Sequence, residues 1–358
     1  MRVAVLGAGN GGVASAFDFA QHGHDVALFA PPEYDENVVA VAAAGGITAS
    51  GDLEGFVPVR YSGSDAAEAM AGAELVVVVG PAYSTEPLAA AVGPHLTDGM
   101  AVLVCPGSCA GAIAFVRAAG LELGDERCIV GETSTLPYAV RVTEPGVVNV
   151  FLKLTTGVYL AGLPRSGTER LCELVREVWP AVERAESVLQ TTLQNGNPVI
   201  HPAVTLLNAG LLERTGGDFL FYEEGVTESV GRLIEAVDGE RLAIAAALGV
   251  TIHSDPALGV RQGYMREENY STGYSRAPGF LGIKAQNRLD HRYLTEDVGY
   301  GLVFMTDLAA RLGVPTPVMD SVIAIASVVL DRDFRAEGER TLGTLGLDGM
   351  SAEELAAL

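Results

Sequence analysis

Short apolar runs alternate with helical segments along the first half of the chain. Residues 3–6, 26–29, 73–79 and 100–105 are apolar runs of the kind found in strands that are covered on both faces. The segments between them, such as residues 14–20, place apolar side chains at helical spacing. This alternation predicts βαβ units and a parallel sheet. We expect two later runs, residues 147–154 and 158–163, to extend the same sheet.

The second half of the chain has the helical period throughout. It predicts a long helix over residues 227–248, another over 291–313 and a last core helix ending near 329. A chain of 358 residues exceeds the usual size of a single hydrophobic core. We therefore predict an α/β Rossmann-type dinucleotide-binding domain at residues 1–190, followed by an all-α substrate-binding and catalytic domain at residues 191–358.

A glycine-rich turn follows the first predicted strand. In the stretch GAGNGG, Gly7 allows the tight turn, Gly9 lets backbone amides approach a pyrophosphate, and Gly12 lets the next helix pack closely on the strand. This motif is weak by itself, but here it lies inside a βαβ pattern at the first strand. We therefore expect the turn, including Asn10 and Gly11, to bind a dinucleotide.

The end of the second strand bears on which dinucleotide is bound. Rossmann folds usually carry an acid there for the ribose of NAD, or an arginine nearby for the 2′-phosphate of NADP. This chain has Ala30 at that point and no arginine between it and Arg60. The missing phosphate clamp favours NADH, and NADPH stays an alternative. Two further strand ends should cover the nicotinamide and its riboses, and their residues are Gly80, Pro81, Ala82, Pro106 and Gly107.

Charge and cysteine content limit the partners and the compartment. The formal net charge of −22 argues against nucleic acid and against an anionic membrane surface, both of which need basic patches. The four cysteines form no CxxC pair and no metal-ligand spacing, so we expect reduced thiols, no metal site and a cytoplasmic location. The N-terminus runs directly into a buried strand, so we expect no signal peptide. The oligomeric state stays open, with a homodimer among the states allowed.

His201 is the candidate proton-transfer residue. It lies in the stretch LQNGNPVIHPAVTLLNAG, between the strand-rich and the helix-rich half, and clefts between domains commonly bind ligands. Both Pro198 and Pro202 are compatible with a first helical turn, and we expect the helix to begin at the second. His201 would then project from the positive end of that helix, which disfavours the imidazolium form. Asn208 would share its face.

Glu132 is the second candidate, because it ends a predicted sheet strand in the segment GETSTLPYAVR. The alternative is a structural ion pair with Arg141, and the sequence does not decide between the two. A histidine oriented by a carboxylate can manage protons during hydride transfer to a C=O or C=N group. Enzymes of the 6-phosphogluconate and ketopantoate reductase types carry a lysine acid on the helix that opens the second domain. This chain has no lysine there, which argues against those types.

Several blocks of sequence resemble the octopine/nopaline dehydrogenase family, the opine dehydrogenases. Nearly the whole chain takes part, and the carriers are GAGNGG, GETSTLPYAVR, NPVIHPAVTLLNAG, FYEEGVTESVGRLIEAVDGERLA and HRYLTEDVGYGL. The resemblance implies a reductive condensation of a 2-oxo acid such as pyruvate with the amino group of an amino acid. In that reaction NAD(P)H delivers hydride to the carbon of an imine.

The resemblance also implies roles for individual residues. His201 matches the catalytic histidine and Glu132 the acid that orients it, while Thr133 would contact the oxo acid. Arg292 matches an arginine that binds a substrate carboxylate, with an ion pair to Glu296 as the alternative. Two further substrate contacts are expected without a firm role: Asn208, for which a buried hydrogen bond between helices is the alternative, and Tyr138.

Two other functions stay in view. The first is an NAD(P)-dependent reductase of a simple 2-oxo acid, of the ketopantoate reductase or 3-hydroxyacid dehydrogenase type. The second is a dinucleotide sensor without catalytic activity. The sequence gives no sign of which amino acid is used, nor of the stereochemistry.

Overall fold

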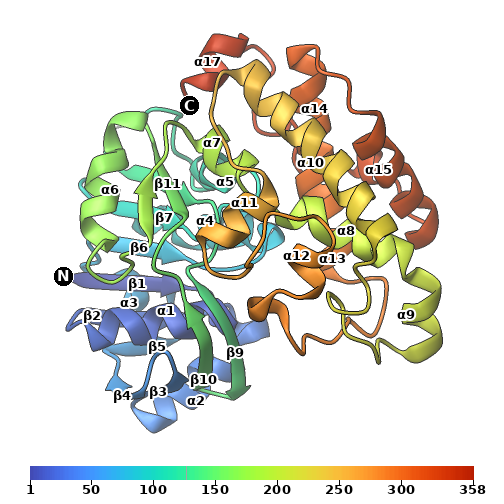
Figure 1. Cartoon of the computed structure of the whole chain (residues 1–358). Coiled ribbons are helices and arrows are strands. Elements are labelled where there is room, and N and C mark those ends of the chain that lie inside the picture. The colour runs from blue at the N-terminus through green and yellow to red at the C-terminus, as the bar shows by residue number, and fades with distance from the viewer. Residues whose placement is uncertain (126) are drawn as a thin grey trace. The chain divides into compact units, whose positions relative to one another are not determined.

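The computed structural model describes residues 1–125 and 127–358, which divide into two compact units. The first comprises Met1–Thr191 together with Leu358, and the second comprises Thr192–Ala357 (Figure 1). The named strands lie in the first unit, and the second is built from helices. The predicted class, an α/β unit followed by a helical one, is confirmed.

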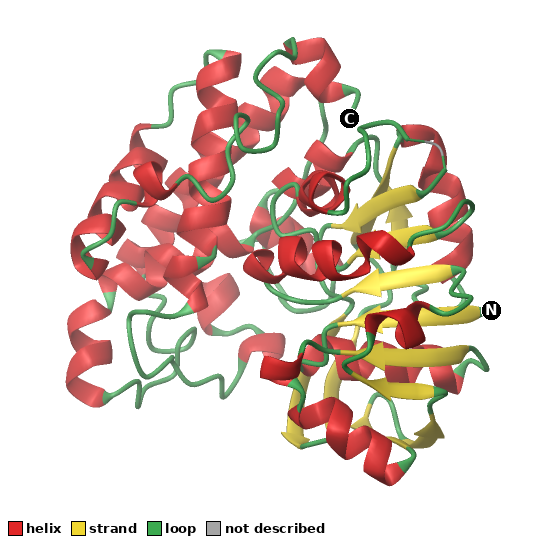
Figure 2. Cartoon of the chain, turned by 180° about the vertical axis from the view of Figure 1, so that it is seen from behind, coloured by secondary structure: helices red, strands yellow, loops and turns green. Residues whose placement is uncertain are grey.

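An eight-stranded sheet forms the centre of the first unit, and strands are yellow in Figure 2. Its order is β12-β11-β8-β7-β6-β1-β2-β5. The strands from β8 to β5 are parallel to their neighbours, whereas β11 runs antiparallel to β8. Their apolar runs are buried because helices cover both faces, as expected for a parallel sheet. The strands are β1 (Arg2–Leu6), β2 (Asp25–Phe29), β5 (Tyr61–Gly63), β6 (Leu75–Val78), β7 (Ala101–Val104), β8 (Ile129–Thr133), β11 (Val158–Leu163) and β12 (Val182–Arg184).

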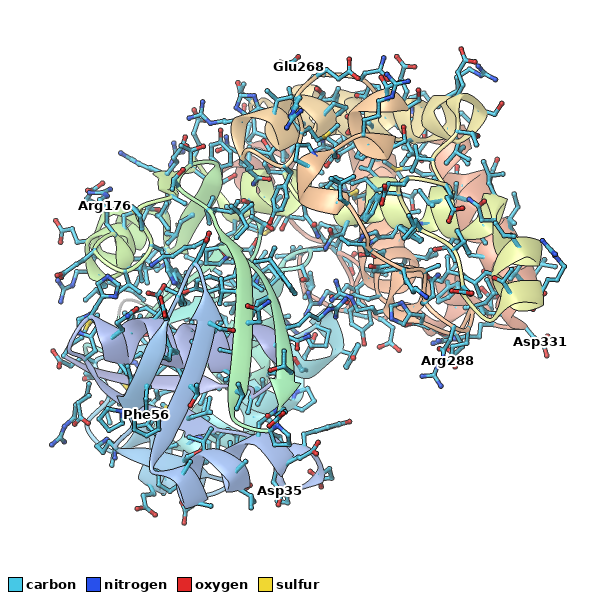
Figure 3. The ribbon with its side chains drawn as sticks, turned by 60° about the horizontal axis from the view of Figure 1, so that its bottom comes forward. Asp35, Phe56, Arg176, Glu268, Arg288 and Asp331 are labelled. Carbon is cyan, nitrogen blue, oxygen red and sulfur yellow. The ribbon has the colours of Figure 1, made fainter. Side chains whose placement is uncertain are left out.

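A separate four-stranded sheet corrects one expectation about the later strands. Its order is β4-β3-β10-β9, with β3 (Gly46–Gly51), β4 (Gly55–Pro58), β9 (Tyr138–Glu144) and β10 (Val147–Lys153). Only β11 of the two expected extensions joins the large sheet, because β10 pairs with β9 as a hairpin and with β3 in parallel. Phe56 lies on β4, with 55% of its surface exposed (Figure 3).

Helices of the first unit connect these strands. They are α1 (Asn10–Gln21), α2 (Glu36–Ala44), α3 (Ala66–Met70), α4 (Thr85–Val92), α5 (Gly111–Ala118) and α6 (Thr168–Val175), and α7 (Val188–Leu193) contains the border between the units. The start of α1 directly after β1 gives the predicted strand–turn–helix around the glycine-rich turn.

The helical unit is organised around α10 (Glu228–Leu248), which contacts α8 (Asn197–Leu207), α14 (Val303–Leu312) and α15 (Pro317–Leu330) (Figure 1). The hydroxyl of Thr227 accepts the Val230 N–H at the start of α10, and Gly249 ends it at a φ of 80°. The remaining helices are α9 (Ala209–Thr215), α11 (Asp255–Arg261), α12 (Thr272–Ser275), α13 (Arg292–Thr295), a π-helix over Asp297–Leu302, α16 (Phe334–Glu337) and α17 (Ala352–Ala356).

A capping box begins the C-terminal helix α17. The Ser351 hydroxyl accepts the Glu354 N–H at 3.2 Å, and the Glu354 carboxylate accepts the Ser351 N–H at 2.7 Å. Among the described residues, no helix combines the length and the apolar character needed to cross a membrane.

Candidate functional site

The glycine-rich turn between β1 and α1 leaves an open backbone surface. Gly7 has a φ of 97°, and a Cβ on Gly12 would overlap the Gly7 carbonyl oxygen, so both positions require glycine. A Cβ on Gly9 would meet nothing within 4 Å. No side chain caps α1, whose first amides follow Gly9. This geometry fits a pyrophosphate, because free helix N-terminal amides and the helix dipole favour anions.

Two asparagines hold the glycine-rich turn in place. Asn37 of α2 donates to the Ala8 carbonyl at 2.9 Å and accepts the Gly146 N–H at 3.0 Å. Asn10 accepts the Val142 N–H at 2.8 Å. Sequence reasoning missed Asn37, since nothing in the sequence indicates that α2 passes beside the turn.

The other expected cofactor residues follow neighbouring strands of the large sheet. Ala30 directly follows β2 and is buried, and Gly80, Pro81 and Ala82 follow β6. Pro106 and Gly107 follow β7. Because β1, β2, β6 and β7 are parallel, these residues share the carboxyl edge of the sheet, where open α/β folds bind ligands.

Glu132 of β8 is fully buried and supports the loop before α5. Its carboxylate accepts the Ala112 N–H at 2.8 Å and the Thr191 hydroxyl at 2.7 Å. A Cβ on Gly107 would come within 2.5 Å of that carboxylate, so only glycine leaves room for it. The loop contains three consecutive left-handed residues, Ser108–Ala110, with φ of 42°, 68° and 59°. Left-handed backbone is costly for residues with a Cβ. The hydrogen bond from the Ala112 N–H to the Glu132 carboxylate anchors the first turn of α5, which follows this run.

Thr133 directly follows Glu132 and is also buried. Its hydroxyl donates to the Thr135 carbonyl at 3.0 Å. Burial raises the pKa of the neighbouring Cys105 thiol to about 12, against the opposing effect of a hydrogen bond with Thr133. Cys105 is therefore an unreactive thiol beside the expected oxo-acid contact.

Tyr138 does not have the environment expected of a substrate contact. It is 4% exposed, its hydroxyl donates to Asp18 of α1 at 2.6 Å, and it accepts the indole N–H of Trp179. Lys153 also donates to Asp18, at 2.8 Å. Its hydroxyl belongs to a buried polar cluster that joins α1 to β9 and β10, and these contacts give no support to a substrate role.

The helix that carries His201 begins earlier than expected. It starts at Asn197, where the Asn195 side chain accepts the Asn197 N–H at 3.1 Å, and Pro202 lies inside it. His201 is therefore in the second helical turn, and the argument from the positive helix end does not apply to it. The residue is 95% buried.

Both nitrogens of the His201 imidazole have hydrogen-bond partners within the helical unit. Nδ1 lies 2.8 Å from an Asp297 carboxylate oxygen, and Nε2 lies 3.1 Å from the Tyr222 hydroxyl. Tyr293 stacks on the ring with centroids 3.9 Å apart. Within the helical unit, Asp297 is therefore the acid that orients the ring, and the role expected for Glu132 stays a prediction. Since a carboxylate accepts and an imidazole must donate to it, Nδ1 carries the hydrogen and Nε2 is left for proton transfer.

Asp297 opens the π-helix, an element that is rare and often found at functional sites. Sequence reasoning missed Asp297, although it directly follows Glu296 in the quoted block HRYLTEDVGYGL. The one available signal was a carboxylate beside glycines in a segment that already carried a candidate arginine.

The remaining substrate candidates have structural partners. Arg292 lies 3.3 Å from the Glu296 carboxylate, so the ion pair offered as its alternative is present, while its side chain stays 42% exposed. The Asn208 amide donates to the carbonyls of Val204 and Gly225, at 2.8 and 2.9 Å. Gly225 lies in a turn before α10 and the bond is partly buried, so it is not the buried bond between helices that was the alternative.

A buried ionic cluster anchors the residues that precede α8, the helix that carries His201. Arg241 is fully buried, pairs with Asp238 and donates to the carbonyls of Leu193 and His253. Gln194 exchanges two further bonds with the His253 backbone, at 2.8 and 3.2 Å. These contacts fix the residues just before α8, which sets the direction from which His201 projects.

Comparison with known proteins gives consistent relatives. Residues 184–330 match the family model described as NAD/NADP octopine/nopaline dehydrogenase, alpha-helical domain. An opine dehydrogenase of Arthrobacter sp. (strain 1C) is 36% identical over 98% of this chain and 96% of its own length. A solved octopine dehydrogenase with NADH and L-arginine aligns with a TM-score of 0.80 at 18% identity, over 100% of this chain and 98% of its own. A yersinopine dehydrogenase with NADP+ aligns with a TM-score of 0.71 at 17% identity, over 99% and 96%.

Proposed function

Because the chain belongs to the octopine/nopaline dehydrogenase family, we propose that it condenses a 2-oxo acid such as pyruvate with the amino group of an amino acid. The product is an N-(1-carboxyalkyl) amino acid. The observation that carries the proposal is the buried pair of His201 and Asp297, with Nδ1 and the carboxylate 2.8 Å apart. When bound, the reduced nicotinamide supplies the hydride for the imine carbon.

His201 manages the protons of this reaction. The amine must lose a proton before it attacks the oxo acid, and the carbinolamine oxygen must gain one before it leaves as water. An imidazole can accept the first proton and return the second. Asp297 keeps the ring in one tautomer and stabilises the imidazolium that forms in between.

Two further residues serve substrate binding in this proposal. Arg292 offers paired guanidinium donors to a substrate carboxylate, in competition with Glu296. Thr133, at the carboxyl end of β8, contacts the oxo acid. We assign no substrate role to Tyr138.

We also propose NADH as the preferred cofactor. Arg60, the first arginine after β2, donates to the carbonyls of Glu68 and Ala69 at 3.3 and 3.1 Å, which commits its guanidinium. The segment after β2 carries acids, Glu33 and Asp35, and the latter lies at the start of α2 (Figure 3). Acids suit ribose hydroxyls and repel a 2′-phosphate.

The test is a turnover assay with pyruvate, a panel of amino acids and either NADH or NADPH. We expect oxidation of NADH that depends on one class of amino acid, with the condensed product identified by mass spectrometry. The His201→Ala variant should lose about 10²- to 10⁴-fold in turnover and keep its NADH affinity. Oxidation of NADH that needs no amine would instead support a reductase of simple 2-oxo acids. Wild-type turnover in the variant would remove His201 from the chemistry, and a lower KM for NADPH than for NADH would reverse the cofactor assignment.

A further inference from the structure

The reactive nitrogen of His201 faces a phenol. With Nδ1–H donated to Asp297, a neutral imidazole has only a lone pair at Nε2, so the Tyr222 hydroxyl 3.1 Å away donates to it. Any proton that enters or leaves Nε2 must pass through that hydroxyl or wait until it moves away. Tyr222 comes from the segment between α9 and α10, which no step of the proposed function has used so far.

Tyr222 is held firmly by its neighbours. It is 5% exposed, stacks on Phe280 with centroids 4.3 Å apart, and meets the edge of Phe221 at 5.0 Å. Tyr264 also stacks on Phe280, with ring centroids 5.5 Å apart. Swinging the phenol away from the imidazole would give up these ring contacts, which stabilise the buried position of the phenol. The hydroxyl therefore stays beside Nε2 during turnover.

From this geometry we propose that Tyr222 is a catalytic residue that carries protons between His201 and the substrate. The inference rests on the proposed function. As the amine loses its proton to the phenol oxygen, the phenol proton moves to Nε2, and the imidazolium is paired with Asp297. On the return step, the Nε2 proton moves to the phenol oxygen while the phenol proton passes to the carbinolamine hydroxyl, which leaves as water. Protons and charge balance in both steps, and no electron is transferred.

The environment of the phenol requires that the two transfers be concerted. Burial, followed by the charges of Tyr293 and two aspartates, raises the pKa of Tyr222 well above its usual value. A free phenolate is therefore too costly to accumulate. A phenol oxygen donates one hydrogen bond and accepts others, so it can face the imidazole and a substrate group together.

The decisive variant is Tyr222→Phe, which removes one oxygen and keeps the ring stack. We expect kcat to fall by about 10²-fold, with little change in the KM for pyruvate or in thermal stability. The matched control is Tyr264→Phe, which removes a hydroxyl from the same aromatic stack and should keep wild-type kcat. A purely structural role for Tyr222 would lower stability, and a blocking role would raise kcat in the variant.

A second measurement reports how many protons move together in the proton-transfer step. In single turnovers with increasing deuterium content, the wild-type rate should fall along a curve, because two hydrogens move together, and the Tyr222→Phe rate along a line. An active wild type with equal kcat in the Tyr222→Phe variant, or with a linear deuterium dependence, overturns the relay alone. A wild type that condenses no oxo acid with any amine overturns the proposed function and the relay with it.

Discussion

The imidazole Nδ1 of His201 lies 2.8 Å from the carboxylate of Asp297, although the two residues are 96 positions apart in the chain. Each is at least 95% buried, so the pair is shielded from water and held in one geometry. A buried carboxylate of this kind fixes which nitrogen carries the hydrogen and stabilises the charge that the ring gains in turnover.

The Asp297→Asn variant tests the contribution of that charge. The amide can still accept the Nδ1–H, so the fold and substrate binding should be retained, but the imidazolium loses its counter-charge. We expect kcat to fall by about 10²- to 10⁴-fold, with a KM for pyruvate within a few-fold of the wild type. Steady-state kinetics check this, and a kcat equal to wild type would show that the carboxylate only supports the fold.

The Gly12→Ala variant tests the packing of α1 on the glycine-rich turn. The added Cβ would overlap the Gly7 carbonyl oxygen, so the backbone that faces the pyrophosphate must move. We expect NADH affinity to fall by about 10- to 100-fold, which corresponds to the 1–3 kcal/mol typical of overpacking. Fluorescence titration with NADH measures it. Gly210→Ala is the matched control, since a Cβ there meets nothing within 4 Å and should leave affinity unchanged.

Asp255 makes the stability of the protein depend on pH. Burial and the nearby Asp238 raise the pKa of Asp255 from 3.8 to about 6, against the opposing effects of Tyr274 and Arg241. The folded state therefore binds a proton more tightly than the unfolded chain, and stability falls as pH rises from about 4 to about 6. Above about pH 7 this group leaves the free energy of unfolding lower by about 3 kcal/mol than it is at low pH.

The Asp255→Asn variant should remove that loss. Its stability relative to wild type is expected to rise between pH 4 and pH 7, by an amount of the order of 2–3 kcal/mol. Urea unfolding at several pH values measures the difference. The exposed Glu268, labelled in Figure 3, offers the control variant Glu268→Gln, whose difference from wild type should not follow this course. A stability difference for Asp255→Asn that is constant with pH would contradict the prediction.

Two glycines of α10 should respond in opposite directions to alanine. A Cβ on Gly239 would meet nothing within 4 Å, so Gly239→Ala should raise the free energy of unfolding by about 0.5–1 kcal/mol through helix propensity. A Cβ on Gly231 would come within 2.6 Å of the Tyr270 carbonyl oxygen, so Gly231→Ala should lower it by about 1–3 kcal/mol. Thermal or urea unfolding of both variants measures these changes. A change of the same sign in both variants would contradict the prediction.

Local patterns in the sequence were enough to predict the helices and strands and to identify His201, one member of the His201–Asp297 pair. The buried runs around β1, β2 and β6, the glycine-rich turn and α10 follow from periodicity and from the steric needs of glycine. Asp297 could not be found this way, because its approach to His201 depends on a π-helix and on how α13 contacts α8. Periodicity carries no information about such meetings between distant segments.

The two other errors have the same origin. Pro198 and Pro202 were both acceptable as helix starts, and the side chain of Asn195 decides for the earlier one. The placement of β10 in its own sheet depends on parallel pairing with β3, where Ser50 and Asn149 bond across 99 positions. Strand periodicity identifies β10 as a strand but cannot choose its neighbour.

His201, Asp297, Tyr222 and Tyr293 all come from one stretch of the gene, the part that encodes residues 192–357. The proton-handling residues and the ring that stacks on the imidazole are therefore inherited as a single block. Recombination that exchanges the first 191 codons between relatives would transfer the dinucleotide-binding half to a new lineage without adding or removing any of these four side chains. Evolution can thus alter the choice of reductant independently of the acid–base apparatus.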